Sequence, residues 1–316
     1  MPLKNAYYHI KPFVPLALRV AFRRWRASRR RVTYASDWPI KEGSERPPSG
    51  WLGWPDGKRF ALVLTHDVEG KKGLARCRSL MELEASLGFR SCFNFIPEGG
   101  YSTPDELRGE LTSNGFEVGV HDLKHDGKLY QSRTVFKVNA ERINYYLAKW
   151  HAVGFRSAFM HHNLDWLHDL NILYDASTFD TDPFEPQPDG VHTIFPFLVA
   201  ASDTRGYVEI PYTLVQDFNL FVILQEENID IWKRKLDWIA QCGGMAHLDT
   251  HPDYMSFAAT NVPAYEYDPA LYKQFLVYVK DKHKDLYWNA LPRQIAQFFR
   301  AASKCATSIA CGRISK

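Results

Sequence analysis

The apolar and polar positions of the chain predict strands and helices in alternation. A continuous apolar run over residues 60–65 indicates a strand that is buried on both faces. Further strands are predicted at 91–96, 116–120, 155–160, 207–210 and 244–249. Helical periodicity covers residues 73–87, 104–114, 134–150, 231–241, 269–282 and 292–302.

This alternation determines the expected fold class. Strands that alternate with helices form βα units and a mostly parallel sheet. The units follow one another without a linker in mid-chain, which favours one (β/α) barrel over two open-sheet domains. We therefore expect an α/β protein with a barrel domain at 59–302, an N-terminal segment at 1–58 and a C-terminal tail at 303–316. In such a barrel, catalytic groups lie at the C-terminal ends of the strands.

The N-terminal segment has a different pattern. After Pro15, the residues Leu18, Ala21, Phe22 and Trp25 recur at helical spacing, and arginines flank the apolar stripe that they form. Residues 36–58 are rich in Trp, Pro and Gly, which predicts a linker or a strap over the surface.

Charge distinguishes the N-terminal segment further. Residues 1–36 hold nine Lys or Arg and no acid, although the whole chain has 39 basic and 36 acidic residues. The remainder is mildly acidic, with 30 basic against 36 acidic residues, so we expect no nucleic-acid-binding body. A basic amphipathic segment at 1–35 has two interpretations: peripheral contact with an anionic membrane, or packing against the barrel with a solvated arginine face.

The cysteines and the hydropathy of the chain indicate where in the cell the protein is expected. The five cysteines include no C-x-x-C pair, which argues against a disulfide scaffold and a thiolate zinc site. No apolar run approaches the roughly 20 residues of a membrane span, and no signal peptide is recognisable. The expected location is cytoplasmic, with the inner membrane face as the place of any peripheral contact.

Polar, metal-capable side chains follow the predicted strands. Asp67 and Glu69 lie two residues apart at the end of the first strand, so both can point to one side. His121 and His125 follow a later strand, and spacing of four puts two imidazoles on one side of a helical turn. One carboxylate and two histidines make a facial metal site, and the second carboxylate can serve as a base.

Each of these motifs also has a plain structural interpretation. The two histidines of an H-x-x-x-H pair can simply be hydrogen-bonded loop residues, and the chain holds a second such pair at His247 and His251. The two acids can be solvated loop residues. The position after a buried barrel strand favours the functional interpretation of Asp67 and Glu69.

Taken together, four segments resemble the polysaccharide deacetylases, carbohydrate esterase family 4. The similarity runs from about Phe60 to Trp288. The matching segments are Leu64-Thr-His-Asp-Val-Glu69, His121-Asp-Leu-Lys-His125, Phe155-Arg-Ser-Ala-Phe159 and Leu248-Asp-Thr-His-Pro252. The resemblance implies a distorted (β/α) barrel, a divalent metal, foremost Zn²⁺, and hydrolytic removal of acetyl groups from N-acetylated sugars.

The resemblance also implies roles for individual residues. Asp67 matches the family's base, which activates the metal-bound water, and His251 matches the general acid that protonates the leaving amine. Arg156 matches the arginine that holds the base, and the backbone N–H of Phe159 falls where the family has an oxyanion donor. The implied metal ligands are Glu69, His121 and His125.

The sequence departs from the family pattern in three places. Val68 stands where the family commonly has a second aspartate as metal ligand, and Glu69 is the replacement we assign. Ala158 stands where proline is usual. The acid that orients His251 has three candidates in the matching stretch, namely Asp175, Asp180 and Asp182. Three histidines near the motifs are interpreted as cleft or packing residues, namely His66, His161 and His162.

The sequence thus predicts a metal-dependent hydrolase that removes N-acetyl groups from a glycan or a lipid-linked sugar. One alternative is a related barrel that cleaves a non-sugar C–N bond. The other is a non-catalytic glycan-binding or assembly protein, which the loss of a metal ligand at Val68 would allow.

Overall fold

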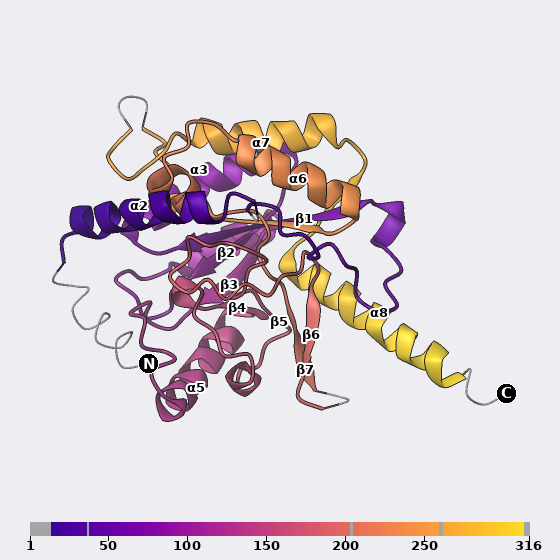
Figure 1. Ribbon diagram of the computed structural model, residues 1–316. Helices are drawn as coiled ribbons and strands as arrows, with labels where there is room; N and C mark the ends of the chain where they lie inside the picture. The colour runs from indigo at the N-terminus through magenta and orange to yellow at the C-terminus, as the bar shows by residue number, and fades with distance from the viewer. Residues whose placement is uncertain (1–13, 37, 203–204, 259–261, 313–316) are drawn as a thin grey trace.

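A mostly parallel β-sheet forms the centre of the molecule, and helices pack around it (Figure 1). The computed structural model describes residues 14–36, 38–202, 205–258 and 262–312, and beyond residue 302 it describes the backbone alone. The strand order is β6-β7-β5-β4-β3-β2-β1-β8, and β9 also pairs with β1. Only the pair of β6 and β7 is antiparallel among these strands.

The elements have the following bounds. The strands are β1 Phe60–Val68, β2 Cys92–Phe95, β3 Glu117–His121, β4 Gly154–Arg156, β5 Tyr174–Asp175, β6 Phe197–Ala200, β7 Gly206–Glu209, β8 Met245–Thr250 and β9 Tyr287–Asn289. The α-helices are α2 Leu16–Thr33, α3 Lys71–Leu87, α4 Asp105–Ser113, α5 Arg133–Trp150, α6 Asp230–Cys242, α7 Pro269–Lys282 and α8 Pro292–Gly312. Shorter helical turns are η2 Pro55–Gly57, η3 Ala158–Met160, η4 Trp166–Asp169, the π-helix η5 Phe218–Ile223 and η6 Pro252–Tyr254.

The sheet curls into the predicted (β/α) barrel. Strand β1 is buried along its whole length, as its continuous apolar sequence requires. Isolated parallel bridges extend the ring beyond the regular strands, joining Leu214 to Leu248 of β8 and Phe179 to Tyr212. Since irregular segments rather than full strands form this part of the ring, the barrel is a distorted one.

The helices predicted from periodicity are present, with most ends displaced by only a few residues. Helix α7 has the predicted bounds, and α4 ends before Gly115, which takes the expected left-handed conformation at φ 83°. Helix α8 continues to Gly312, past the predicted domain boundary at residue 302. The boundaries proposed for the N-terminal segment, the barrel and the tail stay predictions.

Other elements were not predicted from the sequence. Strand β5 has two residues and β9 has three, which is too short for an alternation pattern to be recognised. The segment predicted as a strand at 155–160 divides instead into β4 and the turn η3, because Phe159 and Met160 have positive φ angles of 57° and 54°. These two left-handed residues redirect the chain after β4.

Helix α2 packs against the barrel with several of its arginines turned inward. Arg23 Nη2 donates to Asn219 Oδ1 at 2.8 Å, and Arg24 Nε donates to the carbonyl of Val222 at 2.9 Å. The apolar side chains of Leu18 and Phe22 are 62% and 59% exposed. The packing expected for this segment is therefore present, but only Arg29 and Arg31 of the arginine face are exposed, while others bond to the barrel. Irregular backbone beneath the helix presents carbonyls that need donors, and guanidinium groups meet that need better than apolar side chains.

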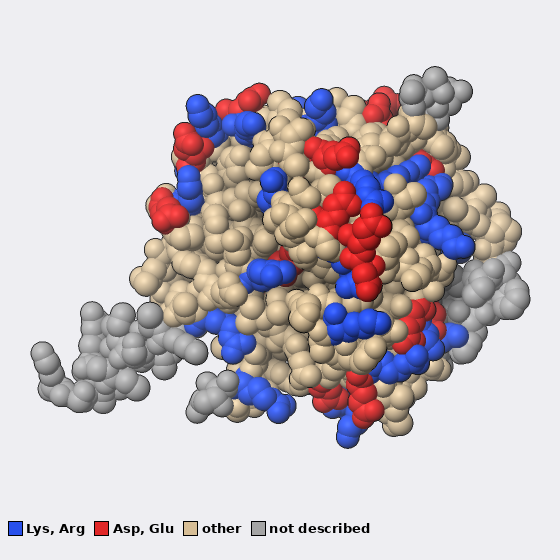
Figure 2. Space-filling model, turned by 180° about the vertical axis from the view of Figure 1, so that it is seen from behind, with Lys and Arg blue, Asp and Glu red and all other residues tan. Residues whose placement is uncertain are grey.

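Charge and hydropathy of the described residues add two observations. On the face shown in Figure 2, Lys and Arg side chains are interspersed with Asp and Glu and form no single continuous basic surface. Among the residues that the structure describes, no helix is both long and apolar enough to cross a bilayer.

Candidate functional site

The side chains singled out from the sequence converge on one cavity. Its volume is about 820 Å³, within the range of small-molecule sites. It is lined at the C-terminal end of β1 by Asp67, beyond that strand by Glu69, and by His121 at the end of β3. His125 and His251 also line the cavity. The barrel thus gathers these groups where parallel strands end, as predicted.

Glu69, His121 and His125 form a cluster whose ligand-capable atoms all lie within 4.8 Å of one another. His125 Nε2 is 3.0 Å from Glu69 Oε1. The predicted helical turn between the two histidines is absent, because Asp122 and His125 both have a φ of 55°. A tight loop after β3 brings the imidazoles together instead, with ring centroids 4.9 Å apart.

Hydrogen bonding prepares His121 as a ligand. Its Nδ1 lies 3.1 Å from the carbonyl of Arg156, so Nδ1 carries the proton and donates, and Nε2 keeps a free electron pair. Nε2 is buried and has no hydrogen-bond partner among the described residues. Burial is the main cause that lowers the pKa of His121 to about 4, which keeps the imidazole neutral.

Glu69 completes this cluster as an anion. Burial alone would raise its pKa, but the charge and the hydrogen bond of His125 outweigh burial and hold the pKa well below the usual value. Its second oxygen, Oε2, accepts a hydrogen bond from the Tyr254 hydroxyl at 3.1 Å. Val68 lies in the core, whereas its neighbours Asp67 and Glu69 both reach the cavity.

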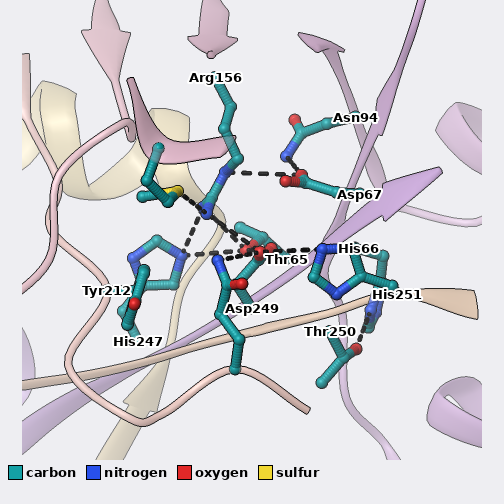
Figure 3. Close-up of polar contacts among 12 residues, drawn as sticks. Thr65, His66, Asp67, Asn94, Arg156, Tyr212, His247, Asp249, Thr250 and His251 are labelled. Carbon is teal, nitrogen blue, oxygen red and sulfur yellow. Dashed lines mark hydrogen bonds and ion pairs between the residues drawn. The ribbon is translucent and has the colours of Figure 1, made fainter. Parts of the chain in front are cut away.

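A second cluster consists of Asp67, Asp249 and His251, which also have ligand-capable atoms within 4.8 Å of one another. Arg156 joins its two carboxylates (Figure 3). Its guanidinium lies 3.5 Å from Asp67 Oδ1 through Nε and 3.2 Å from Asp249 Oδ2 through Nη1. Arg156 is completely buried, so its charge acts at close range in a weakly screening environment.

Further donors hold these carboxylates. Asn94 donates to Asp67 Oδ1 at 2.9 Å, and Thr65 donates to Asp249 Oδ1 at 2.7 Å. Burial opposes the charge of Asp67, yet the cationic Arg156 and His251, together with the hydrogen bond from Asn94, outweigh burial and lower its pKa. Burial raises the pKa of Asp249 to about 8 even beside Arg156. The two acids of this network therefore differ in pKa, and Asp67 is the one that stays ionised.

His251 is oriented by an aspartate that the sequence analysis missed. Its Nδ1 lies 2.7 Å from Asp217 Oδ1, and its backbone N–H donates to Asp217 Oδ2 at 2.8 Å. Burial by itself would lower the pKa of His251, but the Asp217 carboxylate raises it well above its usual value. The imidazole is thus held as a cation whose Nε2 lies 4.0 Å from Glu69 Oε1.

The three predicted partners of His251 have other roles, which corrects that expectation. Asp175 accepts from Ser177 Oγ at 2.8 Å, and Asp180 forms a buried ion pair with Lys235 at 2.5 Å. Asp182 accepts from Tyr212 at 3.1 Å. The sequence signal for Asp217 is its position directly before an apolar run, where its side chain caps the π-helix η5 by accepting from the Phe218 N–H.

The remaining histidines near the motifs divide between core and cavity. His66 faces the opposite side of β1 and lies 2.8 Å from Glu84 in the core, which is a packing role. His161 lines the cavity, whereas His162 lies beside the Met160 carbonyl at 3.0 Å. Phe159 also lines the cavity, and its ring lies 4.5 Å from the ring of His125. The oxyanion role assigned to its N–H stays a prediction.

Helix α2 supplies a wall of the same cavity, which the sequence analysis did not predict. The lining includes side chains from several turns of this helix: Leu16, Leu18, Arg19, Val20, Phe22, Arg23 and Arg26. The lining also includes Phe218 and Tyr254, whose ring centroids lie 4.6 Å apart. The N-terminal segment is therefore part of the candidate site rather than a separate arm.

Comparison with known proteins supports the fold. No protein-family model and no curated sequence matches the chain. A candidate polysaccharide deacetylase from Mycobacterium smegmatis has a similar structure, with a TM-score of 0.61 and 20% sequence identity over 81% of this chain and 96% of that one. This likeness confirms that the chain has the polysaccharide deacetylase fold.

Two further structures are more distant. Peptidoglycan deacetylase PdaC from Bacillus subtilis gives a TM-score of 0.44 at 13% identity, over 81% of this chain and 98% of that one. A candidate polysaccharide deacetylase involved in O-antigen biosynthesis, from Bordetella bronchiseptica, gives 0.43 at 18% identity, over 74% and 85%.

Proposed function

We propose that the protein is a metal-dependent hydrolase that removes N-acetyl groups from a carbohydrate. The observation that carries the proposal is the pairing of two differently charged clusters in one cavity. One offers an open set of metal ligands, and the other offers an ionised carboxylate and a cationic histidine. The similarity to a candidate polysaccharide deacetylase supports the same assignment.

The residues present fit a divalent ion. Glu69, His121 and His125 supply one oxygen and two imidazole nitrogens, a donor set suited to Zn²⁺ with positions left open. The buried Nε2 of His121, without a hydrogen-bond partner in the described part of the chain, supports this assignment. A divalent ion held there would polarise the acetyl carbonyl and lower the pKa of a water molecule beside it.

Asp67 is assigned as the base. Asn94 and Arg156 hold its Oδ1, and its Oδ2 lies 3.7 Å from His121 Nε2, beside the ligand cluster. Because its pKa is lowered, the carboxylate is ionised and able to accept the proton of an attacking water. Arg156 fixes the carboxylate in place without itself exchanging a proton.

His251 is assigned as the acid. An amide nitrogen leaves only when it is protonated, so the reaction needs a proton donor as well as a base. Asp217 keeps His251 protonated and orients its Nε2, which lies 4.0 Å from Glu69 Oε1. Aromatic rings of Phe218 and Tyr254 line the cavity and can stack against a sugar ring.

Acetate release tests the assignment. Protein loaded with Zn²⁺ should release acetate from N-acetylglucosamine oligomers, and His125→Ala should not. A cyclic amide serves as the competing substrate. Hydrolysis of the cyclic amide alone would replace the sugar assignment, and hydrolysis of neither by fully loaded protein would contradict the proposal. The cytoplasmic location expected from the sequence stays a prediction.

A further inference from the structure

We propose that the exposed face of helix α2 binds the surface of an anionic lipid bilayer and thereby places the opening of the cavity beside the lipid. The inference goes beyond the proposed hydrolysis, because it concerns the outer face of the helix that supplies one wall of the cavity. It rests on the orientation of α2, on the distribution of exposed apolar side chains, on charge, and on the continuity of this surface with the cavity.

The exposed face is an apolar stripe at helical spacing. Leu18, Phe22, Trp25 and Val32 follow one another at i, i+4, i+7 and i+14, which places them along one side of the helix. We call these four residues the outer stripe. Their exposed fractions are 62%, 59%, 52% and 80%. Over 18 residues the helix is about 27 Å long, so the outer stripe is a surface feature of considerable length.

Exposed apolar side chains are concentrated on this helix. The described residues include 12 large hydrophobic side chains that are exposed, and six of them lie between residues 16 and 34. Leu16, the outer stripe and Tyr34 are these six. Scattered apolar residues are normal on a protein surface, whereas a contiguous group marks a site of interaction.

The arginines fix the orientation of the outer stripe. Arg23 and Arg24 donate to Asn219 and to the Val222 carbonyl, and Arg26 Nη2 donates to the Glu185 carbonyl at 2.9 Å. Turning the outer stripe toward the barrel would break these hydrogen bonds. The apolar face is thus held outward by the body of the protein.

Charge favours anionic lipid as the occupant. Residues 1–36 hold nine basic residues and no acidic one. Arg29 is exposed on the same side of the helix as the outer stripe, and its guanidinium lies 4.6 Å from the Trp25 ring. Basic side chains beside an apolar stripe meet lipid headgroups while the apolar side chains enter the interface. A second copy of the chain on this face would instead bring its own exposed Arg29 toward the first.

The outer stripe is continuous with the candidate site. Leu18 and Phe22 belong both to the outer stripe and to the lining of the cavity, and Arg19 lies between them in the lining. A bilayer against α2 would therefore lie next to the cavity opening. Given the proposed function, on which this step rests, the favoured substrate is an N-acetylated sugar presented at a lipid surface.

Co-sedimentation with vesicles tests the docking surface directly. The intact protein should bind phosphatidylcholine vesicles that contain phosphatidylglycerol, and raised salt should weaken that binding. The variant to compare is Trp25→Ser with Val32→Ser, because neither side chain lines the cavity. Removing these two apolar groups should weaken vesicle binding by roughly 10- to 100-fold.

The matched control lies on another helix. Val138→Ser with Tyr145→Ser on α5 removes side chains that are 59% and 58% exposed, and vesicle binding should not change. Val32→Ser alone should give a smaller loss in the same direction. Equal binding by the α2 and α5 double variants would overturn the proposal. So would failure of the intact protein to bind, or a dimer in solution that the α2 variant abolishes.

A second readout separates this inference from the proposed function. Acetate release is compared between free N-acetylglucosamine oligomers and the same sugar attached to a lipid in anionic vesicles. The α2 double variant should lose the preference for the vesicle-bound sugar and keep its rate on the free one. If neither sugar is hydrolysed, the proposed function fails, while vesicle binding still decides whether the outer stripe is a docking surface.

Discussion

Two clusters of the same residue types share the cavity, and they differ in their charged neighbours. Glu69, His121 and His125 have ligand-capable atoms within 4.8 Å of one another. Asp67, Asp249 and His251 meet the same criterion, but Arg156 lies between the two aspartates at 3.5 Å and 3.2 Å. A guanidinium already supplies the positive charge that a metal ion would bring, and it would repel the ion.

The type of side chain therefore does not by itself define a metal site. In the first cluster, burial and a backbone carbonyl keep His121 neutral with Nε2 available. In the second cluster, Asp217 keeps His251 protonated, and a protonated imidazole cannot bind a metal. The first cluster therefore suits metal binding and the second suits proton transfer.

The largest expected effect comes from removing a ligand of the first cluster. His125→Ala should remove most of the bound metal and reduce acetate release by roughly 10³-fold or more, because a metal contributes several kcal/mol of charge stabilisation. Elemental analysis of the purified variant and a discontinuous acetate assay measure the two effects. Full metal retention would place the ion elsewhere. His162→Ala, outside the cavity lining, is the control.

Next in size is the loss of the base from the second cluster. Asp67→Asn keeps the shape of the side chain and should lower kcat/KM by roughly 10²- to 10⁴-fold. Because Asp67 is assigned no ligand role, metal content should stay near that of the unaltered protein. A variant that loses activity and metal together would show that Asp67 is a ligand.

The third prediction concerns stability. Arg156→Leu leaves buried Asp67 and Asp249 without their cation, so the free energy of unfolding should fall by about 3–5 kcal/mol. Arg133→Leu removes an exposed partner of Asp169 and should cost less than about 1 kcal/mol. Urea unfolding of both variants measures the contrast. Similar losses in the two variants would argue against a tightly coupled network around Arg156.

The smallest expected effect is a shift in pH dependence. His251 acts as an acid only while protonated, so the rate falls as pH rises through its pKa. Asp217 raises that pKa, and with Asp217→Asn burial dominates and lowers it. The high-pH limb of the kcat profile should therefore move to lower pH, with a rate loss of roughly tenfold at neutral pH. An unmoved limb would remove His251 from the role of acid.

The sequence correctly predicted the buried strand, most of the helices and the side chains at the strand ends, and the physical reason is clear. Asp67, His121, Arg156 and His251 lie at or directly after the C-terminal ends of strands, and parallel strands bring these ends to one side of a barrel. The apolar run of β1 and the helical periodicity are local patterns that survive without knowledge of the tertiary fold. The position of Glu69 directly after the first strand likewise predicted that it lies near the two histidines.

The orientation of His251 and the orientation of α2 could not be predicted, because both depend on contacts between segments that are distant in the sequence. Asp217 meets His251 across 34 residues, and its capping position before an apolar run does not by itself indicate a contact with His251. The orientation of α2 depends on Asn219 and on a carbonyl at Val222, about 200 residues away. The helical pattern predicts an apolar stripe flanked by arginines. Whether the stripe or the arginines face the barrel depends on the groups that the barrel presents to the helix.

The central claim is that Glu69, and not Asp67, supplies the carboxylate of a metal site. The most direct measurement is a Zn²⁺ titration by isothermal calorimetry of the metal-free protein, Glu69→Gln and Asp67→Asn, side by side. With Glu69 as the ligand, Glu69→Gln should lose most of its Zn²⁺ affinity, and Asp67→Asn should bind nearly as the unaltered protein does. Retained affinity in Glu69→Gln together with lost affinity in Asp67→Asn would contradict it.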